Sequence, residues 1–112
     1  MTTVEIYRKN GKIIRYRANG HSDDSKEEGH DIVCAALSII LQSPIGGMQD
    51  LLEVYPKFDL DDDGHLDVQM DGMPLNNKEK EIDVLLGTMM IMLKELRKEY
   101  PKNLKLVEKE VK

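Results

Sequence analysis

The chain has 112 residues and a formal net charge of −5 at pH 7, which suits one domain with one hydrophobic core. The acidic balance argues against nucleic acid as a ligand, because binding to phosphate requires a basic surface. One cysteine excludes an internal disulfide and suits the reducing cytoplasm. The sequence has no recognisable signal peptide and no apolar run near 18 residues, so neither export nor contact with a membrane is expected.

The first elements are predicted to form a β-hairpin. Residues 2–8 and 12–18 alternate between apolar and polar side chains, as strands do, and Asn10-Gly11 between them is a strong two-residue turn signal. The candidate inward positions are Val4, Ile6, Ile14 and Tyr16.

A helix is predicted from Asp31 to about Leu52. Its first half is apolar on nearly all sides, which indicates burial by the sheet and by a second subunit. Ser43-Pro44 and Gly46-Gly47 are expected to kink or interrupt it.

The second half of the chain predicts two strands, a helix and a strand. Lys57–Leu60 and His65–Met70 form a hairpin, and a long amphipathic helix begins at Asn76 or Asn77 and ends before Pro101. The apolar stripe of this helix is Ile82, Leu85, Leu86, Met89, Leu93, Leu96 and Tyr100. A strand from Leu104 to Val111 completes the order ββαββαβ. We therefore expect a single α+β domain over residues 1–112, with two helices packed on a mixed sheet.

The only cysteine, Cys34, lies near the predicted start of the first helix. If Asp31 caps that helix, Cys34 is its third residue, where unpaired N–H groups and the helix dipole favour thiolate over thiol. Those N–H groups, including that of Cys34, would also be able to hold an oxyanion. Cys34 is thus a candidate nucleophile.

A histidine that has no obvious place in the core lies a short loop upstream of this cysteine. Gly20 ends the second predicted strand, His21 follows it, and the polar loop Ser22 to Glu28 returns at Gly29 to the cysteine helix. This loop is expected to be mobile and to close over a substrate. The arrangement can bring His21 to Cys34, which would form a Cys/His pair for nucleophilic catalysis.

Gly20-His21 and the run Gly29-x-Asp31-Ile32-Val33-Cys34-Ala35-Ala36-x-Ser38 resemble the ribosomal-processing cysteine proteases of Firmicutes and related bacteria. The resemblance extends over the full length of the chain. It implies a homodimeric endopeptidase that removes the N-terminal extension of large-subunit ribosomal protein twenty-seven. By position, Cys34 would be the nucleophile and His21 its base. The polar loop lacks an aromatic residue that some relatives carry.

Two supporting residues keep alternative roles. Asp31 either caps the helix or orients His21. Ser38 lies one turn beyond Cys34 and either bonds to the Cys34 carbonyl or lines the site.

Three other interpretations compete with the protease. A zinc site built from His21, His30, Asp31 and Cys34 is one of them, although no metal or other cofactor is expected. Asp59-x-Asp61-x-Asp63-Gly64 resembles the start of a calcium loop, but Met70 stands where such a loop has glutamate, which favours an acidic turn. The third is a non-catalytic dimeric module that binds ribosomal or other basic proteins.

Overall fold

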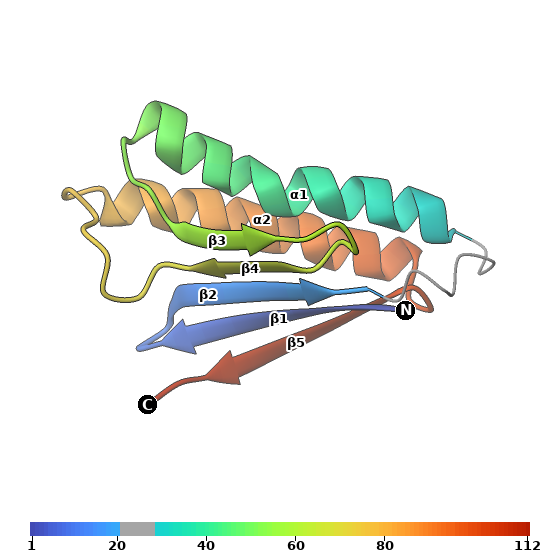
Figure 1. The fold of residues 1–112 in the computed structure, drawn as a ribbon. Coiled ribbons are helices and arrows are strands. Elements are labelled where there is room, and N and C mark those ends of the chain that lie inside the picture. The colour runs from blue at the N-terminus through green and yellow to red at the C-terminus, as the bar shows by residue number, and fades with distance from the viewer. Residues whose placement is uncertain (21–28) are drawn as a thin grey trace.

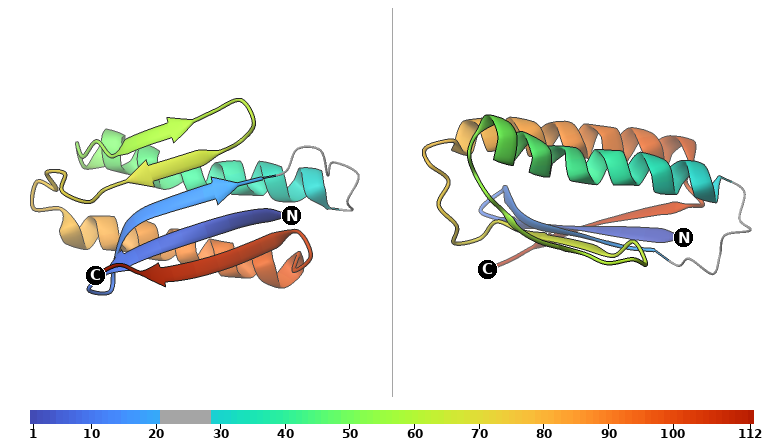
Figure 2. Two further views of the ribbon diagram at one scale, coloured as in Figure 1. Left: turned by 60° about the horizontal axis from the view of Figure 1, so that its bottom comes forward. Right: turned by 45° about the horizontal axis from the view of Figure 1, so that its top comes forward.

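The computed structural model describes residues 1–20 and 29–112 and has the predicted order ββαββαβ. The strands are β1 (Thr2–Lys9), β2 (Lys12–Asn19), β3 (Lys57–Leu60), β4 (Leu66–Gln69) and β5 (Leu104–Glu110), and the helices are α1 (His30–Leu51) and α2 (Glu79–Glu99). The strand order is β3-β4-β2-β1-β5, in which β1 and β5 are parallel and the other neighbours antiparallel. Both helices lie on one face of this sheet (Figures 1 and 2). The α+β prediction is confirmed.

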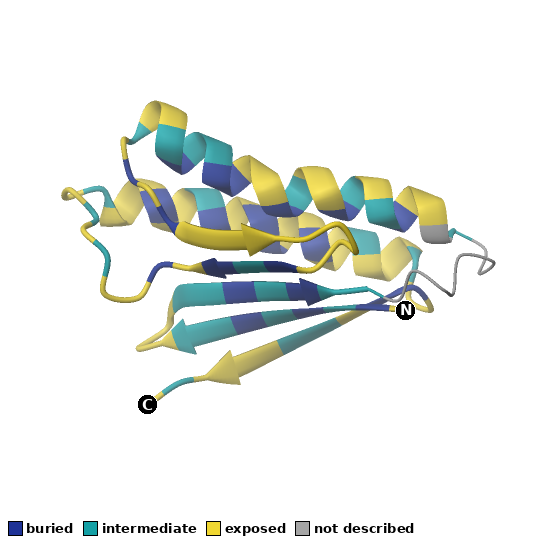
Figure 3. Cartoon of the chain, in the orientation of Figure 1, coloured by how far each residue is buried: buried dark blue, intermediate teal, exposed yellow. Residues whose placement is uncertain are grey.

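The hydrophobic core lies between the helices and the inner face of the sheet (Figure 3). The stripe on α2 is confirmed: its predicted residues are buried (Ile82, Leu86, Met89 and Leu93) or partly buried against the core (Leu85, Leu96 and Tyr100). Met90 is buried as well and was not predicted. Val33, Leu37, Leu41, Ile45 and Met48 form the corresponding stripe on α1. The sheet therefore positions α1, and with it Cys34, through a buried row of aliphatic side chains.

The first hairpin has the predicted turn, but the predicted alternation of inward and outward side chains is interrupted near that turn. Asn10 and Gly11 have φ values of 53° and 80°, as a type I′ turn requires. The β1–β2 register shifts between Tyr7 and Arg8. Such an irregularity reverses which side chains face the core. Ile13, not Ile14, therefore packs against the core, and the prediction for Ile14 was wrong.

The α1 helix is continuous, contrary to the expected interruption, and Pro44 lies inside it. An 18-residue window within Asp31–Leu51 has a mean hydropathy of 1.5, so by length and composition this helix could cross a membrane, which corrects the expectation that no such run exists. Its buried face packs on the sheet as part of the hydrophobic core. The start of α2 is also later than predicted: Asn76 and Asn77 have left-handed φ values of 55° and 62°, which a helix excludes.

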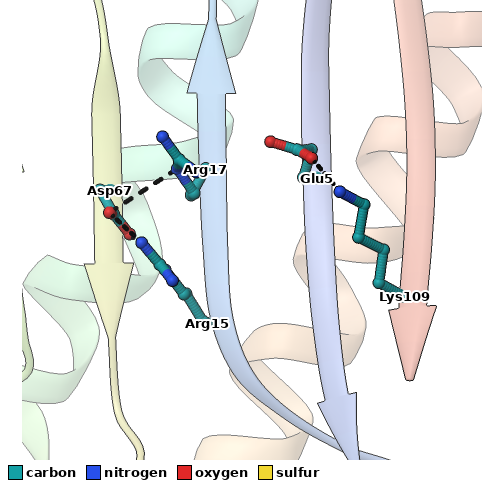
Figure 4. A network of polar contacts seen from close by, with 5 residues as sticks. All are labelled: Glu5, Arg15, Arg17, Asp67 and Lys109. Atoms are coloured by element: carbon teal, nitrogen blue, oxygen red, sulfur yellow. Dashed lines mark hydrogen bonds and ion pairs between the residues drawn. The ribbon is translucent and has the colours of Figure 1, made fainter. Parts of the chain in front are cut away.

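The outer face of the sheet has a row of ion pairs instead of a third layer (Figure 4). Arg15 donates two hydrogen bonds to Asp67, Nε to Oδ1 at 2.9 Å and Nη2 to Oδ2 at 2.6 Å, and Arg17 lies 3.7 Å from the same carboxylate. Lys109 bonds Glu5 between β5 and β1 at 2.6 Å. These pairs tie neighbouring strands together across the exposed face.

The Arg15–Asp67 pair is expected to make stability depend on acid pH. The hydrogen bond from Arg15 lowers the pKa of Asp67, so its contribution is present above the ordinary carboxyl pKa and is lost as pH falls through the lower folded-state value. Asp67→Asn should lower the free energy of unfolding by about 1–2 kcal/mol at pH 7. Urea unfolding at pH 7 and pH 3 measures the difference, which should shrink at the lower pH. Asp62→Asn, at an exposed turn position, is the control, and an equal loss at both pH values would contradict the prediction.

Candidate active site

Cys34 lines a pocket of about 150 Å³ between α1 and the sheet. An apolar cavity of about this volume can hold a benzene ring, so the pocket has room for one apolar side chain. From α1 the lining residues lie on one helical stripe: Cys34, Leu37, Ser38, Leu41 and Gln42. From the sheet side they are Thr2, Ala18, Gly20, Leu60 and Leu66, with Asp63 and Gly64 of the β3–β4 turn. Cys34 is half-buried, so a peptide inserting a side chain here would pass beside it.

The start of α1 differs from the prediction. Its N-cap is Gly29, and Asp31 makes no capping hydrogen bond but lies exposed in the first turn. The carbonyl of Gly29 accepts the first intrahelical bond, from Val33 N–H at 3.0 Å. Cys34 is thus the fifth helical residue, and its N–H lies inside the helical ladder. The prediction that Asp31 caps the helix was therefore wrong. The position of the Cys34 N–H inside the helix argues against its predicted oxyanion role.

Ser38 combines the two roles that the sequence left open. Its Oγ donates to the carbonyl oxygen of Cys34 at 3.1 Å, one turn back along α1. The same residue lines the pocket. Ser38 therefore bonds the Cys34 carbonyl to the next turn of α1 and also forms part of the pocket wall.

Two candidate glycines have different structural roles. Gly29 has a left-handed φ of 83°, and a Cβ there would lie 3.0 Å from Cδ1 of Tyr100 and 3.3 Å from Oδ1 of Asn103. Gly20 is not in the left-handed region, and a Cβ there would make an ordinary 3.4 Å contact with Thr2. Gly29 is therefore needed to begin α1 against the end of α2, whereas Gly20 is a pocket wall without a side chain.

Gly29→Ala is expected to destabilise the protein by about 1–3 kcal/mol, because it combines an unfavourable φ with a close approach to Tyr100. Urea unfolding followed by circular dichroism measures this. Gly46→Ala is the matched control: Gly46 lies within α1 with open space around its Cα, so alanine there should stabilise by up to about 1 kcal/mol. Equal effects of the two substitutions would contradict the assignment.

The β3–β4 turn has the structure of an acidic turn. Oδ1 of Asp61 accepts from the N–H groups of Asp63 at 3.0 Å and His65 at 2.9 Å, and Oδ2 contacts Nδ1 of His65 at 2.9 Å. The backbone hydrogen bond from His65 is the main cause of the lowered pKa of Asp61. Asp61, Asp63 and His65 hold potential ligand atoms within 4.8 Å of one another. All three are exposed, and their bonds to one another close the turn.

Comparison with known proteins identifies the family. The profile of the cysteine protease Prp matches residues 1–105. The chain belongs to the Prp family of cysteine proteases. It is 33% identical over 108 residues to the ribosomal processing cysteine protease Prp of Staphylococcus aureus, covering 95% of this chain and 97% of that protein.

Two solved structures of the Staphylococcus aureus protease have the same fold. One, in complex with a substrate peptide, is 32% identical with a TM-score of 0.84, and the other, with a covalently linked product peptide, is 33% identical with a TM-score of 0.79. Each match covers 97% of this chain and 100% of the other. Like its relatives, the chain is a cysteine protease that hydrolyses peptide bonds.

Of the predicted catalytic pair, the structure describes only Cys34. His21 and the loop Ser22 to Glu28 lie outside the described residues, and of His30 only the backbone is described. The orientation of His21 by Asp31, the closing loop and the zinc set therefore stay predictions. Leu60 and the turn residues Asp63 and Gly64 were not predicted to line the site. The acidic turn was visible in the sequence, but its position beside Cys34 depends on the pairing of β4 with β2.

Proposed function

We propose that the protein is a cytoplasmic endopeptidase that removes the N-terminal extension of large-subunit ribosomal protein twenty-seven, with Cys34 as nucleophile and His21 as its base. The family membership and the name of the Staphylococcus aureus relative support the substrate class. One observation supports the assignment of Cys34 as the nucleophile. A cysteine protease requires a thiol, and the only cysteine of this chain lines the apolar pocket.

The chemistry follows the general course of thiol catalysis. His21 takes the proton of the Cys34 thiol, and the thiolate attacks the scissile carbonyl carbon to form a tetrahedral oxyanion. The N–H groups of residues 30–32 precede the first intrahelical bond at Val33 and are candidate backbone donors for that oxyanion. The C–N bond then breaks as His21 protonates the leaving amine, and water hydrolyses the thioester to release the acid and the thiol.

The test is cleavage of a synthetic peptide that spans the ribosomal extension, followed by mass spectrometry. We expect two products from one cut and, at early times, an enzyme species heavier by the acyl fragment. Iodoacetamide treatment that modifies Cys34 should abolish both. Binding of the peptide by unmodified protein without any cleavage would overturn the proposal in favour of a binding module.

We also propose that two copies form a homodimer through the faces of α1 and α2 that point away from the sheet. Large apolar side chains remain exposed there, Ile32 at 58%, Ile39 at 70%, Val84 at 63% and Ile91 at 64%. Exposed apolar residues in such number on adjacent helices indicate a covered surface.

Sedimentation at micromolar concentration is expected to give about twice the 12.8 kDa chain mass. The double variant Ile39→Lys, Ile91→Lys should shift the protein to monomer, because a dimer would bury both new charges. Lys105→Glu, a charge reversal at an exposed position of β5 and not on either helix, serves as the control. A wild-type monomer at these concentrations would contradict the dimer and leave the protease chemistry intact.

A further inference from the structure

The strand β3 has one unpaired edge. It is terminal in the sheet, and among the described residues no strand lies beyond it. Met70 N–H donates to Ile14 across β2–β4, and Asp61 N–H donates to His65 beside the β3–β4 ladder. Antiparallel hydrogen-bonded pairs recur at every second residue. Because Asp61 is hydrogen-bonded to His65, the backbone N–H and C=O groups of Asp59, two residues earlier, also point toward β4. The N–H and C=O groups of Phe58 and Leu60 therefore point away from β4, along the open edge.

The same two residues leave apolar surface uncovered on the inner face of the sheet. Phe58 is paired in register with Val68, and Leu60 with Leu66. The partners on β4 are 0% and 5% exposed, whereas Phe58 is 42% and Leu60 50% exposed. The helices thus cover the inner face as far as β4 but leave β3 open (Figure 3).

This open edge is continuous with the catalytic pocket. Leu60, the last residue of β3, lines the cavity together with Cys34, Leu37 and Leu41 of α1. A chain lying along β3 would therefore lead directly to the thiol. A second copy of the protein on this edge would instead cover the pocket, which is why we assign the edge to the substrate.

We infer that the substrate binds as an extended strand added to the open edge of β3, with one apolar side chain in the pocket against Leu60. This rests on the proposed function and specifies how the peptide is held. The backbone of Phe58 and Leu60 offers two donors and two acceptors, and an added strand uses such groups for affinity while alternate side chains give specificity. The substrate class is thus an extended segment with an apolar residue near the cut. Leu60 is a positioning residue.

The first test is an ester scan of the ribosomal-extension peptide, in which each amide except the scissile one is replaced in turn. Loss of one hydrogen bond should lower kcat/KM, and affinity for Cys34→Ala, about five- to tenfold. We expect such losses at alternate positions, with changes below about twofold between them. Losses at no position, or equal losses at every position, would overturn the inference.

Failure of this inference is distinguishable from failure of the proposed function. Cleavage of the parent peptide without the alternating pattern would overturn strand addition and leave the function standing. Binding with that pattern to both wild type and Cys34→Ala, without cleavage by wild type, would support strand addition and overturn the proposed function.

The second test measures the contribution of the Leu60 side chain separately from that of the backbone hydrogen bonds. Leu60→Ser should raise KM about tenfold with little change in kcat, and Leu60→Met should restore the wild-type KM. Lys57→Ser is the matched control, because Lys57 is exposed on the same strand but does not line the pocket. An unchanged KM in Leu60→Ser, with wild-type unfolding behaviour, would overturn the role of Leu60.

Discussion

Cys34→Ala is expected to lower the rate of peptide cleavage by about 10⁴-fold or more while the protein stays folded. The substitution removes the atom that would form the thioester, so no acylated enzyme should appear in the mass spectrum. Its cost in stability should be small, because Cys34 is only half-buried and its backbone remains in α1.

Two further variants make this result specific. Cys34→Ser keeps a similar side-chain volume but replaces the thiol with a much weaker nucleophile, and it should be as inactive as Cys34→Ala. Ala35→Ser alters an exposed neighbour on the same helix and should retain activity. Cleavage by Cys34→Ala at the wild-type rate would rule out the thiol mechanism, provided that urea unfolding shows both proteins folded.

His21→Ala is expected to reduce kcat by about 10²-fold or more, the usual contribution of a positioned acid–base group. The prediction comes from the position of His21 in the sequence, between Gly20 at the pocket and the start of the cysteine helix. Steady-state cleavage of the ribosomal-extension peptide measures it, with unfolding curves recorded for each variant.

The other two histidines are the controls. His65 contacts Asp61 in the β3–β4 turn at 2.9 Å, and its replacement should change kcat only a few-fold, as should His30→Ala. Equal losses for His21→Ala and His30→Ala, together with loss of bound zinc, would show a metal site in place of the catalytic pair.

The sequence by itself determined the elements whose signals are local. Asn10-Gly11 closes a two-residue turn because both residues tolerate positive φ. The stripe on α2 follows from apolar residues at helical spacing. The segment containing Cys34 could also be identified from the sequence, because its glycine, polar residues and cysteine are neighbours in the chain.

The tertiary structure decided what depends on contacts between distant residues. The helix begins after Gly29 rather than Asp31, because the left-handed Gly29 packs against Tyr100 and Asn103 at the far end of the chain. Ile13 replaces Ile14 in the core because of a register shift against β1. Leu60 reaches the pocket only through pairing of β3 with β4 and of β4 with β2. Propensity and periodicity act over a few residues, whereas the walls of this site are set by strand register and packing across the whole sheet.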